Sequence, residues 1–312
     1  MRRLASALKW TAFAWVVGLV LLEGVLRLAG AYLTRKFDAS QKSAQQQDCV
    51  TILALGESTT GGVWLESSQS YPGQLQRLLT QRYGRPICVR VPMHVGQNTT
   101  QMYNRFDRYM STLQPRLVIL MCGANNTWSL EESNIGWFLD VTDPDAVGLR
   151  LRLTLDHFRV FKVARMAKYD LDAWRQEARE DLAGTPQYTR WPAPDENIQF
   201  GGRKRAAFLE LWRYEVGHMI DRARARGAAA ILMTYPNYDF PPASDFEALA
   251  AAKHVPLVRN DLMLKPLLAP GLADRYFFHD HAHPKAEGYA VIAAELARLI
   301  EEQDLLRLRS SR

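Results

Sequence analysis

The chain has 312 residues, 47% of them hydrophobic, so it can bury a full core and we expect one domain with additions. Its net charge of +6 is unevenly distributed along the chain. Residues 1–36 hold six basic residues and one acidic residue, which leaves 33 basic and 32 acidic residues in the remainder. The remainder is therefore nearly neutral, which argues against a nucleic-acid-binding face.

The first apolar stretch runs from Trp10 to Tyr32 and is interrupted only by Glu23 and Arg27. Its length is that of a helix that spans a bilayer. The two charged residues are four apart, so they can pair on one face of that helix. Basic residues before the stretch favour a cytoplasmic amino terminus, whereas Arg35 and Lys36 after it weaken that orientation.

We therefore expect residues 1–36 to be a membrane anchor that leaves the rest of the chain outside the cytoplasm. One alternative is a cleaved signal peptide with Ala29-Gly30-Ala31 as its cleavage site, although charged residues lie just before that cut. Another is an amphipathic cytosolic helix. Residues 37–48 are rich in Ser and Gln and predict a flexible tether, so the domain would comprise residues 49–312.

Strands and helices are predicted to alternate in the domain, which implies a parallel sheet covered by helices on both faces. The predicted strands are residues 50–55, 87–91, 117–121, 229–235 and 256–258. The predicted helices are residues 71–83, 100–113, 204–226, 246–253 and 285–306.

Two motifs carry chemistry. Ser58 follows the first predicted strand, in Gly56-Glu57-Ser58-Thr59, and a serine there is held at the carboxyl edge of a parallel sheet. Far downstream the chain reads Asp280-His281-Ala282-His283-Pro284. A histidine with a carboxylate three residues before it supplies a base and the group that orients that base. Together the motifs indicate a serine hydrolase or an acyl transferase.

Two further segments follow predicted strands and contain candidate site residues. Val95-Gly96-Gln97-Asn98 follows the second predicted strand, and Gly123-Ala124-Asn125-Asn126 follows the third. Serine, glycine, asparagine and histidine in this order resemble the SGNH (GDSL-type) hydrolases, over roughly residues 50–300. The chain departs from the family where Glu57 replaces Asp and where Asn126 replaces an Asp that often follows the asparagine. Neither position carries the proton transfer, so we expect activity to survive both changes.

The resemblance implies a flavodoxin-like three-layer α/β sandwich with a five-stranded parallel sheet, and it assigns a catalytic triad. Ser58 would be the nucleophile and His283 the base that takes its proton and returns it to the leaving alcohol. Asp280 would hold the other ring nitrogen of the histidine. No cofactor and no metal are implied.

The resemblance also assigns an oxyanion hole. Its donors would be the backbone N–H groups of Ser58 and Gly96 and the side-chain amide of Asn125. Glycine suits this position because the absence of Cβ lets the backbone approach a substrate. Asn126 lies beside Asn125, and the spacing from Gly123 favours Asn125.

Other interpretations of these residues are weaker. In isolation, Ser58 and Asp280 would be helix caps and Gly96 an ordinary turn glycine. A phosphate-binding loop would need Lys where Gly62 stands, and an α/β-hydrolase elbow would need Gly where Thr60 stands.

The alternating histidines His279, His281 and His283 raise the question of a metal site, because an extended segment would place all three on one face. No Cys or second His pair lies in a matching block, so we expect His279 and His281 to be pocket walls or solvated. We expect His94 to line the site.

Residues 129–203 show no strand-like run, and helical periodicity appears over about residues 149–179. The stretch 150–162 mixes basic and apolar residues. We expect a helical insertion that packs on the core as a surface helix. The alternatives are a cap over the active site, because the insertion follows the Asn125 loop, and a face held against the membrane.

The predicted function is therefore a membrane-tethered, extracytoplasmic serine ester hydrolase that cleaves acyl or O-acetyl esters through an acyl-enzyme. One alternative is an O-acyltransferase that modifies envelope glycans, because water and an alcohol acceptor can use the same triad. A second is a catalytically silent binding or scaffold protein. The expected partners are an ester substrate and the membrane.

The cysteines predict a disulfide. Cys49 precedes the first strand and Cys88 opens the second, its expected neighbour; Ser58 and Gly96 follow them by nine and eight residues and must meet at one edge. The cysteines then lie at a common depth, on strands about 4.7–4.9 Å apart, within reach of a disulfide. Export would favour oxidation. Two separate thiols are the alternative, because neighbouring side chains can face opposite ways. Cys122 is expected to be buried and unpaired.

Overall fold

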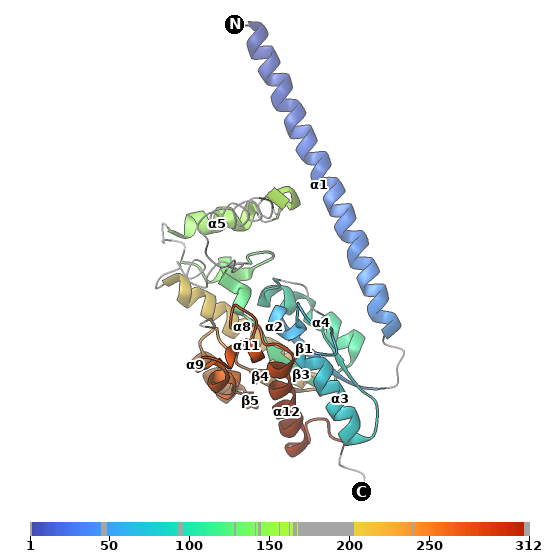
Figure 1. The fold of residues 1–312 in the computed structure, drawn as a ribbon. Helices are drawn as coiled ribbons and strands as arrows, with labels where there is room; N and C mark the ends of the chain where they lie inside the picture. Colours follow the sequence, from blue (N-terminus) through green and yellow to red (C-terminus); the bar gives the residue numbers. More distant parts are fainter. Residues whose placement is uncertain are drawn as a thin grey trace. The chain divides into compact units, whose positions relative to one another are not determined.

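The computed structural model describes residues 2–44, 49–92, 96–127, 129–140, 142, 145–155, 157–161, 163–164, 167, 203–238 and 240–308. The chain divides into two compact units. We call residues 2–44 with the described residues from 147 to 167 the N-terminal unit, and the described residues of 49–146 and 203–308 the sheet unit (Figure 1).

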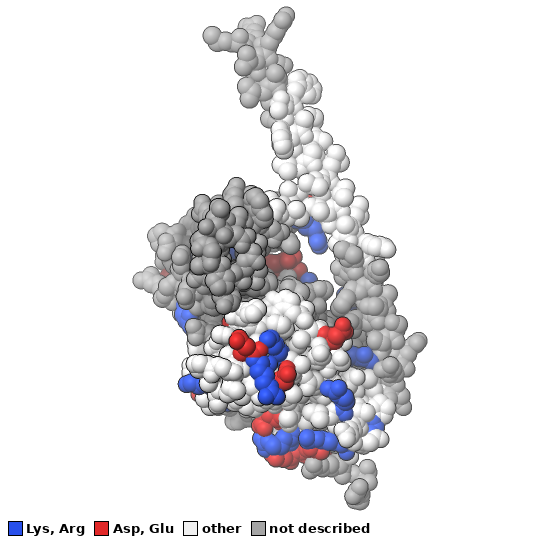
Figure 2. Space-filling model, viewed as in Figure 1, with Lys and Arg blue, Asp and Glu red and all other residues white. Residues whose placement is uncertain are grey.

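The N-terminal unit begins with one long helix, α1 (Arg2–Ala44). Its stretch Lys9–Tyr32 is the one helix in the described part of the chain that is long and apolar enough to cross a membrane. Figure 2 shows this stretch of α1 almost entirely free of charged side chains. The helix runs on through residues 38–44, where we expected a flexible tether. The reason is local: this segment contains Ala, Gln and Lys, which favour helices, and neither Gly nor Pro.

The same unit holds most of α5 (Asp145–Leu155), which lies in the range where we expected a helical insertion. The described residues from 147 to 167 group with α1 rather than with the sheet. The later part of the predicted insertion, residues 168–202, lies outside the described residues.

The sheet unit contains the predicted five-stranded parallel sheet, in the order β2-β1-β3-β4-β5. Its strands are β1 (Val50–Gly56), β2 (Ile87–Arg90), β3 (Leu117–Met121), β4 (Ala229–Met233) and β5 (Leu257–Val258). Central strands of parallel sheets are covered on both faces, and β3 is accordingly buried at every position.

Helices flank the sheet in two groups. In one group, α3 (Tyr71–Tyr83) packs against α12 (Ala286–Glu302). In the other, α8 (Arg203–Ala225) packs between α4 (Thr99–Leu113) and α9 (Ala243–Lys253). This confirms the three-layer arrangement, and the strand order is that of flavodoxin-like folds (Figure 1).

Short helices connect the main elements. They are α2 (Ser58–Gly61), η1 (Ala124–Thr127), η2 (Asn134–Trp137), α10 (Asn260–Leu264), η3 (Lys265–Leu268) and α11 (Ala273–Tyr276). None of these short elements was predicted, because a single turn of helix leaves no periodic pattern in the sequence.

Cys49 and Cys88 form the predicted disulfide, with their Cα atoms 5.8 Å apart. The pairing of β1 with β2 aligns Thr51 with Cys88, so the two cysteines lie at the same end of neighbouring strands. Cys122 is buried and free, as expected.

Candidate active site

The strand order places two of the predicted site segments side by side. β1 and β3 are neighbours, with β2 beyond one and β4 beyond the other, so the chain order reverses between them. Ligands in open parallel sheets bind outside the carboxyl ends of the strands at this reversal. Ser58 begins α2 just after β1, and Asn125 lies in η1 just after β3. Both therefore lie at the edge where reacting groups gather.

Ser58, His283 and Asp280 form a continuous hydrogen-bonded chain. Ser58 Oγ lies 2.7 Å from His283 Nε2, and His283 Nδ1 lies 2.5 Å from Asp280 Oδ2. An ionised carboxylate can only accept, so Nδ1 carries the proton and Nε2 is the acceptor for the serine hydroxyl. This is the tautomer in which the imidazole can remove the proton of Ser58.

Asp280 is held by the backbone of its own turn. Its Oδ1 accepts hydrogen bonds from the N–H groups of Ala282 and His283, each 3.0 Å long. Partial burial opposes ionisation of Asp280, but the hydrogen bonds and charge of His283 outweigh burial, and the pKa of Asp280 falls below its usual value. The side chains of His283 and Asp280 are 12% and 23% exposed, so the pair is shielded but reachable.

A closed turn fixes the position of His283. Its carbonyl accepts from the N–H of Phe278 at 2.9 Å, and Phe277 pairs with Pro284 as an antiparallel bridge. Two aromatic rings stand beside the imidazole: the ring centroid of Trp64 lies 4.8 Å away and that of Tyr238 6.2 Å away. Sequence reasoning missed both rings, because they come from loops far from His283 in the chain.

The turn that carries Ser58 is tightly packed. A Cβ atom at Gly56 would lie 1.9 Å from Thr60 Oγ1 and 2.3 Å from the carbonyl of Met121, so only glycine fits there. On the other side, the hydroxyl of Tyr289 donates to the carbonyl of Thr59 at 2.7 Å and ties the turn to α12. These contacts fix the backbone on which Ser58 sits.

A hydrogen bond links the segments that carry the two other predicted oxyanion-hole residues, Gly96 and Asn125. Asn125 Nδ2 donates to the carbonyl of Gln97 at 3.1 Å, directly after Gly96. Gly96 has a φ of 73°, which glycine adopts without strain.

The side chain of Asn126 is engaged elsewhere. Its Oδ1 accepts from the N–H of Thr99 at 2.9 Å, and its Nδ2 donates to Thr99 Oγ1 at 2.8 Å. Both groups lie in the interior, which favours Asn125 for a role towards the substrate.

Glu57 is buried next to Ser58. From the sequence we expected only that activity would survive a Glu in place of Asp at this position. Its Oε1 accepts from the N–H of Gly123 at 2.6 Å, and its Oε2 accepts from the hydroxyl of Tyr235. That hydroxyl in turn accepts from the N–H of Ala124 at 3.1 Å. Burial raises the pKa of Glu57 to about 7, although the hydrogen bonds from Tyr235 and Gly123 oppose the rise. Glu57 thus braces the segment that leads to Asn125.

His279 and His281 are exposed, which agrees with solvated neighbours, and His94 lies outside the described residues. Within the part of the chain that the structure describes, no group of three or more His, Cys, Asp or Glu side chains could hold a metal ion.

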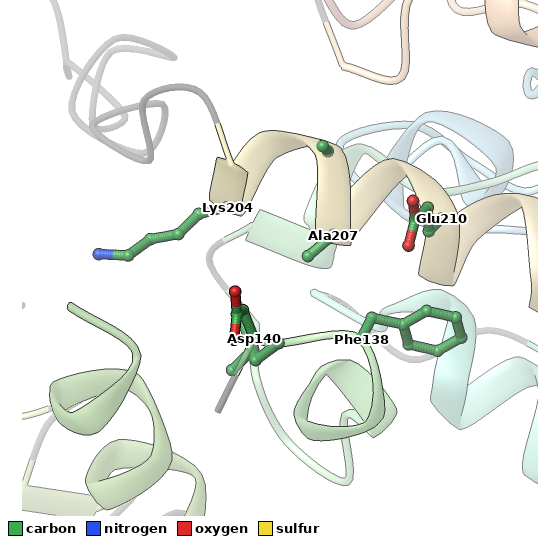
Figure 3. Close-up of a pocket in the computed structure, with 7 residues that line it drawn as sticks. Phe138, Asp140, Lys204, Ala207 and Glu210 are labelled. Atoms are coloured by element: carbon green, nitrogen blue, oxygen red, sulfur yellow. The ribbon is translucent and has the colours of Figure 1, made fainter. Parts of the chain in front are cut away.

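A hollow of about 230 Å³ lies elsewhere in the sheet unit, between the start of α8 and the segment after η2. Figure 3 shows Lys204 and Glu210 reaching it from α8, and Phe138 and Asp140 from the facing segment. It shares no lining residue with the Ser58–His283–Asp280 chain. Basic and acidic side chains are interspersed on the visible face of the sheet unit (Figure 2), as the near-neutral composition indicates.

The chain resembles several solved structures at low sequence identity. They include the psychrotrophic esterase EstA from Pseudoalteromonas sp. (14% identity, covering 81% of this chain and 97% of that one, TM-score 0.46). A GDSL-like lipase from Bacteroides thetaiotaomicron gives 15% identity, 86% and 97% coverage and a TM-score of 0.45. Axe2, an acetylxylan esterase from Geobacillus stearothermophilus, gives 15% identity, 80% and 94% coverage and a TM-score of 0.48.

No curated protein sequence matches the chain. The family assignment rests instead on a family model: residues 54–291 match the GDSL-like lipase/acylhydrolase family. The match covers well over half of the chain and runs from β1 into α12, so it includes Ser58, Gly96, Asn125 and His283. The chain therefore belongs to the GDSL-like lipase/acylhydrolase family and is an ester-hydrolysing enzyme.

Proposed function

We propose that this enzyme is a membrane-tethered, extracytoplasmic serine esterase that uses Ser58, His283 and Asp280 as its catalytic triad. The observation that carries the proposal is the hydrogen-bonded chain from Ser58 Oγ through the imidazole to the carboxylate, at 2.7 and 2.5 Å. It unites residues 225 positions apart in the sequence, in the tautomer that the chemistry needs.

The reaction proceeds in two halves. Ser58 Oγ attacks the ester carbonyl while His283 Nε2 takes its proton, and the imidazolium then gives that proton to the departing alcohol. Water enters, His283 Nε2 removes one of its protons, and the water oxygen attacks the acyl carbon. The bond from that carbon to Ser58 Oγ then breaks, the imidazolium returns its proton to Ser58 Oγ, and the acid is released. Asp280 stabilises the imidazolium in both halves without taking its proton.

Negative charge develops on the carbonyl oxygen in both tetrahedral intermediates. The proposed donors are the backbone N–H groups of Ser58 and Gly96 and the side-chain amide of Asn125. Preset donors of this kind stabilise the transition state because they need no reorganisation during the reaction. The bond from Asn125 to Gln97 and the brace from Glu57 support such presetting.

The proposed location rests on two features outside the site. The stretch Lys9–Tyr32 has the length and hydropathy of a membrane anchor, with basic residues before it. The disulfide between Cys49 and Cys88 fits an oxidising compartment outside the cytoplasm. Residues 1–36 would then anchor the chain, and residues 49–312 would form the enzyme domain with its helical insertion at about residues 129–203.

The test is an esterase assay on the full chain in detergent, with acyl esters of increasing chain length. Wild type is expected to hydrolyse them, and Ser58→Ala is expected to lose the activity while keeping its thermal unfolding midpoint. Activity of Ser58→Ala within tenfold of wild type would contradict the proposed nucleophile. A second assay with an added sugar acceptor distinguishes hydrolysis from acyl transfer. Saturable transfer of the acyl group to the sugar would identify the enzyme as an acyltransferase.

A further inference from the structure

A segment after α5 is hydrogen-bonded to the candidate membrane span. In α1, Glu23 Oε1 accepts from Arg27 Nε at 2.7 Å. The other oxygen of Glu23 accepts from the N–H of Val160 at 2.9 Å, and Arg27 Nη2 donates to the carbonyl of His157 at 2.9 Å. All four residues belong to the N-terminal unit. The two charged side chains therefore hold a distant part of the chain against α1.

Arg159 packs on the same side of the helix. A Cβ atom at Gly30 would lie 2.5 Å from the guanidinium of Arg159, so this side chain occupies the space that glycine leaves open. The contact lies two turns further along α1 than Glu23. The segment is thus seated on α1 over residues 23–30.

The depth of this contact in a bilayer follows from helix length. The apolar run before Glu23, from Trp10 to Leu22, would be only about 20 Å long as a helix, whereas a bilayer core is about 30 Å thick. A spanning α1 must therefore carry Glu23 and Arg27 into the core or to its edge. Charged groups at that depth need partners, which the backbone of His157 and Val160 supplies.

Four large apolar side chains of this region are exposed. Val147 and Leu151 are 67% and 60% exposed and lie four residues apart on one face of α5, whereas Leu149 on another face is buried. After the helix, Phe158 and Val163 are 50% and 49% exposed. Apolar side chains in this number, beside a segment that touches a membrane span, match the buried face of an interfacial helix.

The basic residues of this region also fit contact with a membrane surface. Arg150 and Arg152 are partly exposed on α5, and Arg159 lies at α1. Basic residues that flank an apolar face are attracted to anionic lipid head groups.

We propose that the described residues of 147–163 lie in the surface of the membrane that α1 spans. Val147, Leu151, Phe158 and Val163 enter the boundary between head groups and acyl chains, and Arg150 and Arg152 face anionic head groups. The inference rests on the membrane anchorage proposed above. It adds a second membrane contact, formed by a segment inserted between the Asn125 and His283 parts of the enzyme domain.

The experiment uses the full chain in vesicles of phosphatidylcholine and phosphatidylglycerol. Cys122 is buried and the other two cysteines are bonded, so a new surface cysteine can be labelled selectively. An environment-sensitive fluorophore is placed at Leu151→Cys and Phe158→Cys. Quenching is measured with iodide in water and with a nitroxide on the lipid acyl chain.

Two matched positions serve as controls. Val20→Cys reports on the span itself, since Val20 is exposed on α1, and Leu262→Cys reports an exposed apolar position of the sheet unit. We expect nitroxide quenching at Val20, Leu151 and Phe158, and iodide quenching at Leu151 and Phe158 at least about threefold below that at Leu262.

The outcomes separate the two proposals. Lipid quenching at Val20 together with iodide quenching at Leu151 and Phe158 equal to that at Leu262 would overturn the surface contact and leave the anchor intact. Absence of lipid quenching at Val20 would overturn the anchor, and with it the surface contact that depends on it.

Discussion

The buried carboxyl of Glu57 leads to a prediction about stability and pH. Its pKa rises from 4.5 to about 7 in the folded protein. Folding therefore favours the protonated form, and stability that is fully present below pH 4.5 is lost as the pH rises through 7. A shift of this size at 1.36 kcal/mol per pKa unit corresponds to about 3 kcal/mol. Glu57→Gln cannot ionise and should escape this loss.

The measurement is urea unfolding of the full chain in detergent, for wild type and Glu57→Gln, from pH 4 to pH 8. From pH 4 to pH 8, the free energy of unfolding of Glu57→Gln should rise relative to that of wild type by about 3 kcal/mol. This rise does not depend on the difference between the two proteins at pH 4. Glu215, whose pKa burial raises to about 6, is present in both proteins and cancels in the comparison. Glu66→Gln, at an exposed position, is the control for replacing a carboxyl by an amide. A difference between wild type and Glu57→Gln that stays constant with pH would refute the reasoning.

Three further substitutions test the site and the fold. Asn125→Ala should lower kcat by about 10²–10³-fold, as loss of one oxyanion donor does; an unchanged kcat would move that role to another group. Asp280→Asn should lower kcat by about 10⁴-fold, because an amide that donates to Nδ1 leaves the proton on Nε2 of His283; kcat within tenfold of wild type would contradict this orienting role. Cys49→Ser opens a link across 39 residues and should lower the free energy of unfolding by about 4 kcal/mol. Urea midpoints check this last prediction, and an unchanged midpoint would argue against the bond.

Much of the sheet was predictable because most of its strands are short apolar runs between polar or glycine-containing segments. β1 and β3 are examples: their boundaries lie within one residue of those expected. β4 was predicted two residues too long, since Thr234 and Tyr235 continue the apolar and β-branched pattern. In the fold their side-chain hydroxyls bond to Asp261 and Glu57, outside the sheet. The residue pattern of a strand does not predict hydrogen-bond partners that lie far away in the sequence.

The site was predictable to the extent that its residues follow strand ends. Ser58, Asn125 and His283 have this context or a motif of their own, and the structure brings Ser58 and His283 into contact. The brace between Glu57 and Tyr235 could not be predicted, because it joins residues 178 positions apart and depends on burial. The contact of His157 with α1 has the same character, since it joins residues 130 positions apart through a backbone carbonyl that every residue carries.

Covalent labelling of the nucleophile tests the central claim most directly. A fluorophosphonate is incubated with the full chain in detergent, and the modified peptide is identified by mass spectrometry. The proposed triad predicts a single adduct on Ser58, which disappears in His283→Ala because the serine then lacks its base. An adduct on another serine, or the absence of any adduct in an enzyme that hydrolyses esters, would contradict it.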